Sequence, residues 1–150
     1  MNRNNVLCDI DHTLSNAFHR DPMMAAPMGN GNGWDEYHAA SINDEPLHDM
    51  VRMINVLRPY FNIVAITARP GKWRKLTMDW CLKHEVLFDE LLMRPDDSYH
   101  PAPIIKVQLA LERFPNIKDE VAFILDDRED VVLAFKELGV TALQVHGRKE

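Results

Sequence analysis

The stretch Val6-Leu-Cys-Asp-Ile-Asp-His-Thr13 decides the fold class, because it joins an apolar run directly to clustered acidic side chains. An apolar run broken only by Asp9 is typical of a strand that is buried on both faces of a parallel sheet. Side chains alternate along a strand, so the carboxylates of Asp9 and Asp11 are expected to point to the same side. The first predicted element is therefore a buried strand that ends in acidic chemistry.

Strands and helices alternate over the rest of the chain. Apolar runs predict further strands at 61–66, 90–93, 121–125 and 140–145. Helical spacing predicts a helix that Asn43 or Asp44 caps, with Pro46 in its first turn, and further helices at 71–84, 105–114 and 131–138. This order predicts an α/β fold, with one domain over 1–150 and a five-stranded parallel sheet covered by helices on both faces.

One segment, 15–42, does not fit the alternation. It holds Pro22, Pro27 and three glycines, and no apolar period is sustained through it. A long segment of this kind inside a compact domain is usually functional or disordered. We therefore expect 15–42 to be a long, partly mobile loop on the substrate side of the fold.

Composition excludes several classes of protein. The 150 residues suit one ordinary domain, and the net charge of −6 argues against a protein that coats nucleic acid or an anionic membrane by bulk attraction. No apolar run approaches the ~18 residues of a membrane span. Cys8 and Cys81 suggest neither a disulfide framework nor a zinc site, and no signal peptide is expected before the first strand. A cytoplasmic protein is expected, with Cys8 as a buried apolar residue.

Polar chemistry follows three of the predicted strands. The three strand ends read Asp9-Ile-Asp11-His-Thr13, Thr67-Ala-Arg69 and Asp126-Asp127-Arg-Glu-Asp130. In open α/β sheets, ligands bind beyond the carboxyl ends of the strands. Any one piece alone is equally typical of a turn or a helix N-terminus, but three in order favour a site. Clustered carboxylates stay ionised around a hard cation with oxygen ligands, which predicts Mg²⁺.

This set of motifs resembles the haloacid dehalogenase superfamily of phosphotransferases. Asp9-Ile-Asp-His-Thr-Leu14 matches its first motif, Thr67 its second, Lys106 its third, and Asp126-Asp127 its fourth. The match extends over nearly the whole chain in the expected order. The resemblance implies a single Rossmann-like domain and a phosphomonoesterase.

The resemblance also implies a role for each matched residue. Asp9 would be the nucleophile that forms an aspartyl-phosphate, and Asp11 would protonate the leaving oxygen and then activate water. Thr67 would hydrogen-bond a phosphoryl oxygen, and Lys106 would neutralise charge on Asp9 and the phosphate. Mg²⁺ would be held by Asp9, the main-chain carbonyl of Asp11, and one or both of Asp126 and Asp127. The physics agrees, because attack of one anion on another needs cations between them.

Two features bear on the leaving-group side. His12 stands where this superfamily usually has glycine, and it is near enough to the first motif to touch a substrate, as is His19. The gaps before Thr67 and before Lys106 are too short for a full cap domain. The site is therefore expected to be open, or closed only by the 15–42 segment.

A closer resemblance is to the 3′-phosphatase half of bacteriophage-type polynucleotide kinase/phosphatase. This resemblance rests on three stretches of sequence: the runs from Val121 to Val145, Thr67-Ala-Arg69, and Met93-Arg94 ahead of Lys106. The resemblance implies that Arg69 and Arg94 contact the phosphate or the nucleic-acid backbone. That group has acidic residues just before the motif-three lysine, where this chain has Ala102-Pro-Ile-Ile105. It also has an arginine shortly after the first motif, for which Arg20 is the nearest candidate here. No kinase phosphate-binding motif occurs.

Two sets of aromatic residues invite either of two interpretations. Trp73 lies in the basic stretch Arg69-Pro-Gly-Lys-Trp-Arg-Lys75, where Lys72 and its neighbours would track a nucleic-acid strand while the indole stacks a base. Its helical spacing with Leu76 and Trp80 equally favours packing in the core. Trp34 and Tyr37 are a second candidate pair for base stacking.

The sequence thus predicts a Mg²⁺-dependent phosphomonoesterase whose substrate is a phosphorylated nucleotide or a nucleic-acid 3′ end, most favourably a polynucleotide 3′-phosphatase. One alternative is a 5′(3′)-deoxynucleotidase-like hydrolase of free nucleoside monophosphates, with 15–42 as a lid. Another is a non-catalytic module that binds phosphate or nucleic acid. No membrane association is expected, and the oligomeric state is left open.

Overall fold

A five-stranded parallel sheet forms the centre of the described chain. The computed structural model describes residues 3–24 and 32–146. Its sheet has the order β5-β4-β1-β6-β7, with β1 (Asn5–Cys8) hydrogen-bonded to β4 on one side and β6 on the other. The remaining strands are β4 (Asn62–Pro70), β5 (Glu90–Arg94), β6 (Val121–Asp126) and β7 (Thr141–Gln144). The predicted α/β fold is confirmed.

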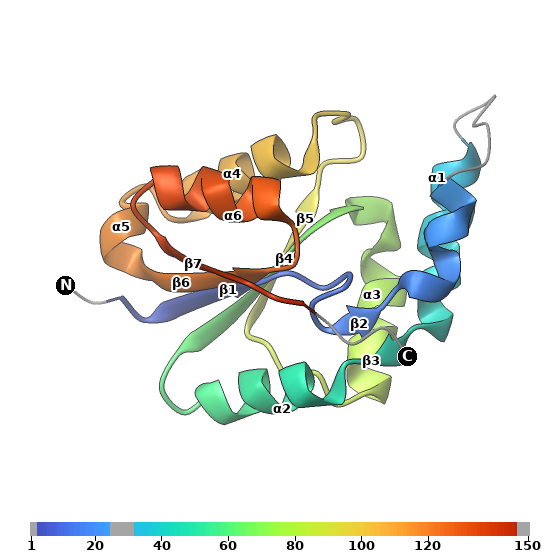
Figure 1. Cartoon of the computed structure of the whole chain (residues 1–150), viewed down its shortest axis with the longest axis horizontal. Coiled ribbons are helices and arrows are strands. Elements are labelled where there is room, and N and C mark those ends of the chain that lie inside the picture. The colour runs from blue at the N-terminus through green and yellow to red at the C-terminus, as the bar shows by residue number, and fades with distance from the viewer. Residues whose placement is uncertain (1–2, 25–31, 147–150) are drawn as a thin grey trace.

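Helices cover both faces of this sheet (Figure 1). One face carries α2 (His48–Leu57) and α3 (Arg74–Lys83), the latter continuing from the short η3 (Gly71–Trp73). The other face carries α4 (Ala102–Arg113) and α6 (Glu129–Glu137), with the single turn α5 (Ile117–Glu120) leading into β6. None of the helices described is long and apolar enough to cross a membrane.

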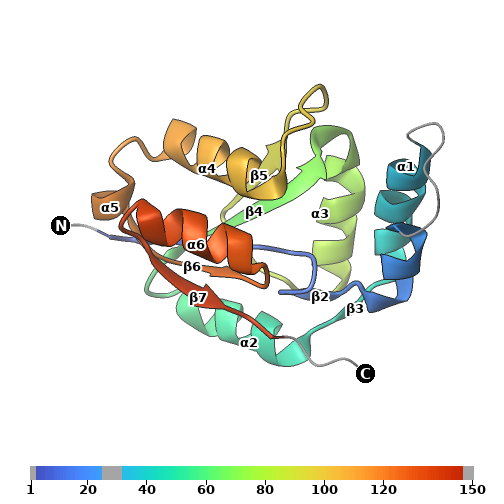
Figure 2. The same cartoon turned by 45° about the horizontal axis from the view of Figure 1, so that its top comes forward.

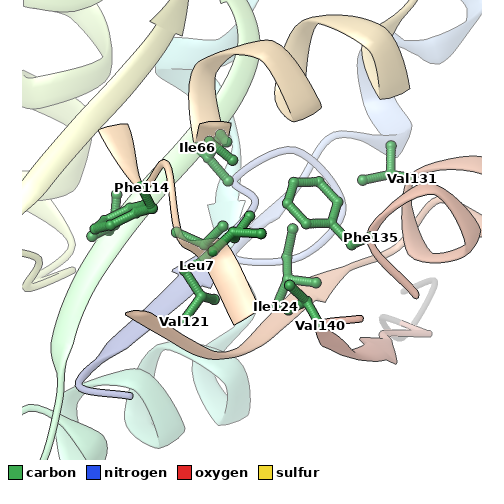
Figure 3. Packing of buried hydrophobic residues seen from close by; sticks show 11 residues of the cluster. Leu7, Ile66, Phe114, Val121, Ile124, Val131, Phe135 and Val140 are labelled. Atoms are coloured by element: carbon green, nitrogen blue, oxygen red, sulfur yellow. The ribbon is translucent and has the colours of Figure 1, made fainter. Parts of the chain in front are cut away.

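Alternation along the central strand divides the core in two. Leu7 packs with Ile66 of β4, Phe114 after α4 and Phe135 of α6, as Figure 3 shows. Its neighbours Val6 and Cys8 point to the opposite face and pack against the side that holds α2 and α3. Cys8 is fully buried, as expected of a small apolar residue. Burial on both faces explains why β1 reads as a continuous apolar run.

The segment between β1 and β4 differs from its prediction. Instead of a loop, 15–46 contains a two-stranded ribbon of β2 (Ser15–Asn16) and β3 (Glu45–Pro46), which encloses η1 (Phe18–Met24), α1 (Asn32–Ala39) and η2 (Ala40–Asn43). The short helical pieces show no sustained period, which is why the sequence pattern missed them. Figures 1 and 2 place η1 and α1 beside α3. Residues 25–31 of the expected loop lie outside the described residues.

Several predicted boundaries also move. The helix predicted from Asn43 or Asp44 begins only at His48, because Pro46 pairs with Ser15 in the ribbon. Asp44 is fully buried and makes ion pairs instead of capping that helix. Strand β4 continues beyond Ile66 to Pro70, with an irregular register after Thr67. The extension carries the second motif while it is still part of the sheet.

Candidate active site

Asp9 lies directly after β1, at the carboxyl edge of the sheet. Its backbone N–H donates to the carbonyl of Leu125 (3.0 Å), and its Oδ2 accepts from the hydroxyl of Thr13 (3.2 Å). The chain then turns tightly, with the N–H groups of Thr13, Leu14 and Ser15 all directed to the carbonyl of Ile10. Asp9 is buried. The central strand and the turn together fix this carboxylate.

His12 occupies the tightest point of that turn. Its φ of 62° lies in the left-handed region, where a glycine is the least strained residue. The imidazole Nε2 lies 3.0 Å from Asp21 Oδ1, and the ring packs 4.6 Å from that of Phe18. The ring is thus held by η1, which belongs to the segment 15–46 between β1 and β4, called the insertion below.

Lys106 links two of the carboxylates. It projects from α4, is buried, and donates from Nζ to Oδ1 of Asp9 (2.7 Å) and Oδ2 of Asp126 (2.5 Å). Burial alone would lower the pKa of Lys106, but the two carboxylates outweigh it and raise the pKa above its usual value. The ammonium is therefore firmly charged beside Asp9.

Asp127 completes a compact acidic cluster with Asp9 and Asp126. One carboxylate oxygen from each of the three lies within 4.8 Å of the others. Burial, followed by the charge of Asp9, raises the pKa of both Asp126 and Asp127 above the usual range. One lysine does not balance three carboxylates, and an all-oxygen donor set of this kind suits Mg²⁺. The donors present therefore fit the predicted metal.

Asp11 does not join that cluster through its side chain. Its carboxylate accepts from Nε (3.0 Å) and Nη2 (2.6 Å) of Arg69 on β4, and also from Nη2 of Arg20 on η1. Burial would raise the pKa of Asp11, but the two guanidinium groups hold it well below its usual range. In this arrangement Asp11 is an ionised acceptor.

Asp44 balances the charge on the other side of Arg20. Its Oδ1 and Oδ2 accept from Nε (2.9 Å) and Nη2 (2.7 Å) of Arg20, a bidentate pair that is completely buried. Two acids and two arginines thus alternate beside the first motif, in the order Arg69, Asp11, Arg20 and Asp44. Arg20 was the nearest candidate in sequence for a further arginine, and the structure brings it into the site. The sequence pattern does not reveal Asp44 as a site residue, because an acid at this position is equally typical of a helix cap.

The other predicted site residues take varied places. Thr67 is buried at the end of β4, and its hydroxyl accepts from the N–H of Arg69 (3.2 Å). Arg94 donates to the backbone carbonyls of Ala68 (2.7 Å) and His100 (2.5 Å), so it ties the segment after β5 to β4. Both lie at the carboxyl edge of the sheet, and their contacts with a substrate stay predictions.

The acidic residue Asp130 lies apart from the three clustered acids. It pairs with Arg128 through Nε (3.0 Å) and Nη2 (2.6 Å), on the exposed first turn of α6. Of the acids in the predicted fourth motif, Asp126 and Asp127 therefore lie in the cluster and Asp130 does not.

With this geometry in place, the family can be assigned. Residues 3–148 match the family of the polynucleotide kinase PNKP phosphatase domain. The chain belongs to this family. It is a phosphatase of the haloacid dehalogenase type, as the sequence motifs predict. The search of curated proteins found no match.

Solved structures agree with the PNKP phosphatase assignment. A chain in a Pnkp1/Rnl/Hen1 complex is 27% identical, with a TM-score of 0.79 over 99% of this chain and 48% of its own length. A second structure, of the Pnkp1/Rnl/Hen1 RNA repair complex, gives the same identity and score over 97% of this chain and 44% of that one. The present chain thus spans about half the length of these two relatives.

More distant structures share the fold. A haloacid dehalogenase-like hydrolase from Streptococcus pneumoniae is 15% identical, with a TM-score of 0.67 over 98% of this chain and 87% of its own. The hydrolase YfnB from Bacillus subtilis, solved with magnesium bound, is 11% identical, with a TM-score of 0.69 over 97% of this chain and 87% of its own.

An aromatic cluster adjoins the Arg20–Asp11 pair of this PNKP-type phosphatase. It joins both predicted stacking sets through a residue that sequence reasoning missed, His38 of α1. The His38 ring lies 5.9 Å from that of Trp34 and 6.3 Å from that of Trp73. Burial lowers the pKa of His38 to about 4, and the nearby charges of Asp11, Arg69 and Arg20 act on it as well. A histidine in an expected loop offered no signal for this position.

Lys72 connects the two sides of the aromatic cluster. Its Nζ lies 2.6 Å from Asp35 Oδ1 of α1 and 5.6 Å from the centre of the Trp73 ring. Both charged groups of this pair are about half exposed. In this structure Lys72 therefore binds the insertion, and its contact with a substrate stays a prediction.

Proposed function

We propose that this protein is a Mg²⁺-dependent polynucleotide 3′-phosphatase that acts through an aspartyl-phosphate on Asp9. The observation that carries the proposal is the bridge of Lys106 between Asp9 and Asp126, with Asp127 completing an oxygen-lined cluster. A buried carboxylate that faces a fixed cation is suited to attack a phosphorus atom. Membership of the PNKP phosphatase family supports the choice of a 3′-phosphate.

In the first step an oxygen of Asp9 would form a bond to phosphorus while the bond from phosphorus to the 3′ oxygen breaks. Lys106 holds Oδ1 of Asp9 and Thr13 holds Oδ2, so both oxygens are oriented. A Mg²⁺ held by Asp9, Asp126 and Asp127 would supply the remaining charge neutralisation. Water would then attack phosphorus, which releases phosphate and restores Asp9.

Asp11 is the proposed acid and base of this reaction. In the structure it is engaged by Arg20 and Arg69, whose guanidinium groups are also suited to a phosphate oxygen. We infer that substrate phosphate draws these arginines from Asp11. The freed carboxylate would take up a proton from water, donate it to the leaving 3′ oxygen, and later accept a proton from the attacking water. Asp44 would keep Arg20 in reach during that exchange, because its bidentate pair is independent of Asp11.

The polynucleotide substrate is supported by the relatives and by the rim of the site. The relatives with a TM-score of 0.79 belong to Pnkp1/Rnl/Hen1 assemblies, one of them described as an RNA repair complex. Lys72, Arg74 and Lys75 follow β4 and are exposed at the same edge of the sheet as Asp9. Cations on this rim are suited to the backbone phosphates of a nucleic-acid strand.

The experiment compares three phosphate donors with Mg²⁺ present: a 3′-phosphorylated oligonucleotide, deoxynucleoside monophosphates and an aryl phosphate. We expect kcat/KM to be highest for the oligonucleotide. Asp9→Asn should lower kcat on it by about 10⁴-fold or more, since a nucleophile is removed. Asp130→Asn is the matched control, because Asp130 is an exposed acid outside the cluster.

Two outcomes would contradict the proposal. Preference for free monophosphates would replace the polynucleotide by a mononucleotide substrate. Equal phosphate release by wild type and Asp9→Asn would remove Asp9 as nucleophile. Mass spectrometry of acid-quenched protein gives a separate readout, a phosphoryl group on the peptide that contains Asp9.

A further inference from the structure

The aromatic cluster brings together residues from two separate parts of the chain. Trp34 and His38 lie four positions apart on α1, and Trp73 ends η3, directly after the strand that carries Thr67. The ion pair between Lys72 and Asp35 (2.6 Å) holds α1 against η3. The cluster therefore joins α1 to the segment that follows β4 at the sheet edge.

Two ring nitrogens in the aromatic cluster have no hydrogen-bond partner. Among the residues described, Nδ1 of His38 and Nε1 of Trp73 are buried polar atoms without a partner, and His38 as a whole is 6% exposed. Buried polar groups are normally paired, because an unpaired one loses its bonds to water without replacement. These two atoms are suited to a ligand that brings its own donors and acceptors.

Trp34 differs from its neighbours in being open to water. It is 44% exposed, whereas Tyr37 and His38, with which it makes ring contacts, are buried. The planar, partly exposed indole of Trp34 lies beside ring nitrogens without partners, an arrangement suited to a planar ligand with polar edges.

The aromatic cluster lies on the leaving-group side of the proposed reaction. Tyr37 connects the aromatic cluster to the residues around Asp11. Its ring contacts Trp34, its ring centre lies 4.3 Å from the Arg20 guanidinium, and its carbonyl accepts from Arg20 Nη1 (3.4 Å). The same Arg20 binds Asp11, the proposed acid toward the leaving oxygen. In a 3′-phosphatase the leaving oxygen belongs to a nucleoside, so its base lies one sugar away from Asp11.

We propose that Trp34, His38 and Trp73 form a nucleobase subsite for the nucleotide that carries the 3′-phosphate. Trp34 stacks on the base, and the ring nitrogens of His38 and Trp73 bond to its polar edge or to its sugar once the ligand displaces the side chains that cover them. This subsite rests on the proposed function, because it assumes that the leaving group is a nucleoside. Stacking on an aromatic side chain accepts any base, so the subsite favours a nucleoside without selecting its sequence.

The kinetic test uses two oligonucleotides that differ only in the base next to the 3′-phosphate, one normal and one abasic. Wild type should have a kcat/KM about tenfold higher on the normal substrate, in line with the value of one stacked base. Trp34→Ala should lose that difference by falling on the normal substrate alone, and Trp34→Phe should retain most of it. Tyr60→Ala is the control, since Tyr60 is an aromatic residue 75% exposed before the start of β4, at the opposite sheet edge.

Equal loss by Trp34→Ala on both substrates, or no loss on either, would overturn the subsite. A second measurement does not depend on catalysis. An oligonucleotide without phosphate, carrying 2-aminopurine at its 3′ end, should lose fluorescence on binding wild type and Tyr60→Ala, but not Trp34→Ala. Quenching without any phosphate release would reject the proposed function and keep the subsite, whereas unchanged fluorescence with all three proteins would reject the subsite.

Discussion

Lys106 shows how much of this site depends on one side chain. Its ammonium is the only cation in hydrogen-bond contact with both Asp9 and Asp126 among the residues that the structure describes. A buried charge is tolerated when it is paired, and removal of one partner leaves the others uncompensated. The lysine therefore stabilises the fold in addition to its proposed part in the chemistry.

We expect Lys106→Met to lower the free energy of unfolding by about 3–5 kcal/mol at pH 7.5 without divalent cations, because Asp9 and Asp126 keep their burial and lose their counter-charge. Urea unfolding followed by circular dichroism measures the change. Lys83→Met is the matched control on the exposed side of α3 and should differ from wild type by less than about 0.5 kcal/mol. An unchanged urea midpoint for Lys106→Met would show that the carboxylates need no lysine.

His38 makes stability depend on pH, because burial lowers its pKa from 6.5 to about 4 in the folded state. The unfolded chain takes up the proton first, so the contribution of His38 is complete above pH 6.5 and is lost as the pH falls from 6.5 to 4. The loss amounts to about 3 kcal/mol at most. Asp11 does not interfere, because its contribution is lost only at a lower pH. Asp126 and Asp127, whose pKa values are raised, act in the opposite sense in this window, but they do so equally in wild type and in a His38 variant.

Urea unfolding at pH 7.5 and pH 5.0 tests this contribution. Wild type should lose more free energy of unfolding between the two values than His38→Gln, which carries no titrating group there. Equal losses in the two proteins would mean that the imidazole is hydrated in the folded state.

At the scale of elements, the buried strands were the easiest to predict, and the insertion was the hardest. Strands covered on both faces are continuous apolar runs, so β1, β4 and β6 and the polar residues at their carboxyl ends could be found from sequence alone. The helices of 15–46 are short, and tertiary contacts such as the Arg20–Asp44 pair stabilise them. Residues placed by such contacts, Asp44 and His38, therefore could not be assigned from periodicity.

The end of α6 offers a test of backbone conformation. Gly139 has a φ of +78°, and its N–H bonds to the carbonyl of Lys136 (2.9 Å) at the turn into β7. Gly139→Ala should cost about 1–2 kcal/mol, because an L-residue is strained in the left-handed region. A Cβ there would also lie 2.7 Å from Cδ of Lys118, a flexible side chain that can move aside.

Gly71→Ala is the matched control for that substitution. Its added Cβ would lie 3.4 Å from Asp96 Oδ1, an ordinary contact, and its φ is not in the left-handed region. The melting temperature of Gly71→Ala should stay close to that of wild type, whereas Gly139→Ala should melt several degrees lower. The reverse order would show that steric crowding outweighs backbone strain at these two glycines.

Charge is unevenly distributed over the whole molecule. The net charge is −6, and Asp9, Asp126 and Asp127 gather at a single sheet edge. These three carboxylates repel one another in the folded state, and the repulsion is relieved in the unfolded chain. A cation bound only by the folded state should therefore stabilise the protein by mass action.

We expect Mg²⁺ at about 100 times its Kd to raise the free energy of unfolding by about 2.7 kcal/mol, and to raise the melting temperature accordingly. Asp127→Asn should reduce this gain, since it removes a charged ligand from the cluster. Asp130→Asn should keep the full gain, because Asp130 pairs with Arg128 outside the cluster. The same gain in Asp127→Asn and wild type would place the cation elsewhere.

The position of β1 in the middle of the sheet has a consequence for synthesis of the protein. This strand is made before the other strands of the sheet, yet its neighbour β6 is built from residues 121–126. Asp9 likewise meets Lys106 across 97 positions of sequence. Pairing over such separations is slow, and it leaves an apolar strand edge open while translation continues. The proposed nucleophile is thus made before the other residues of the proposed site and is among the last to find its partners.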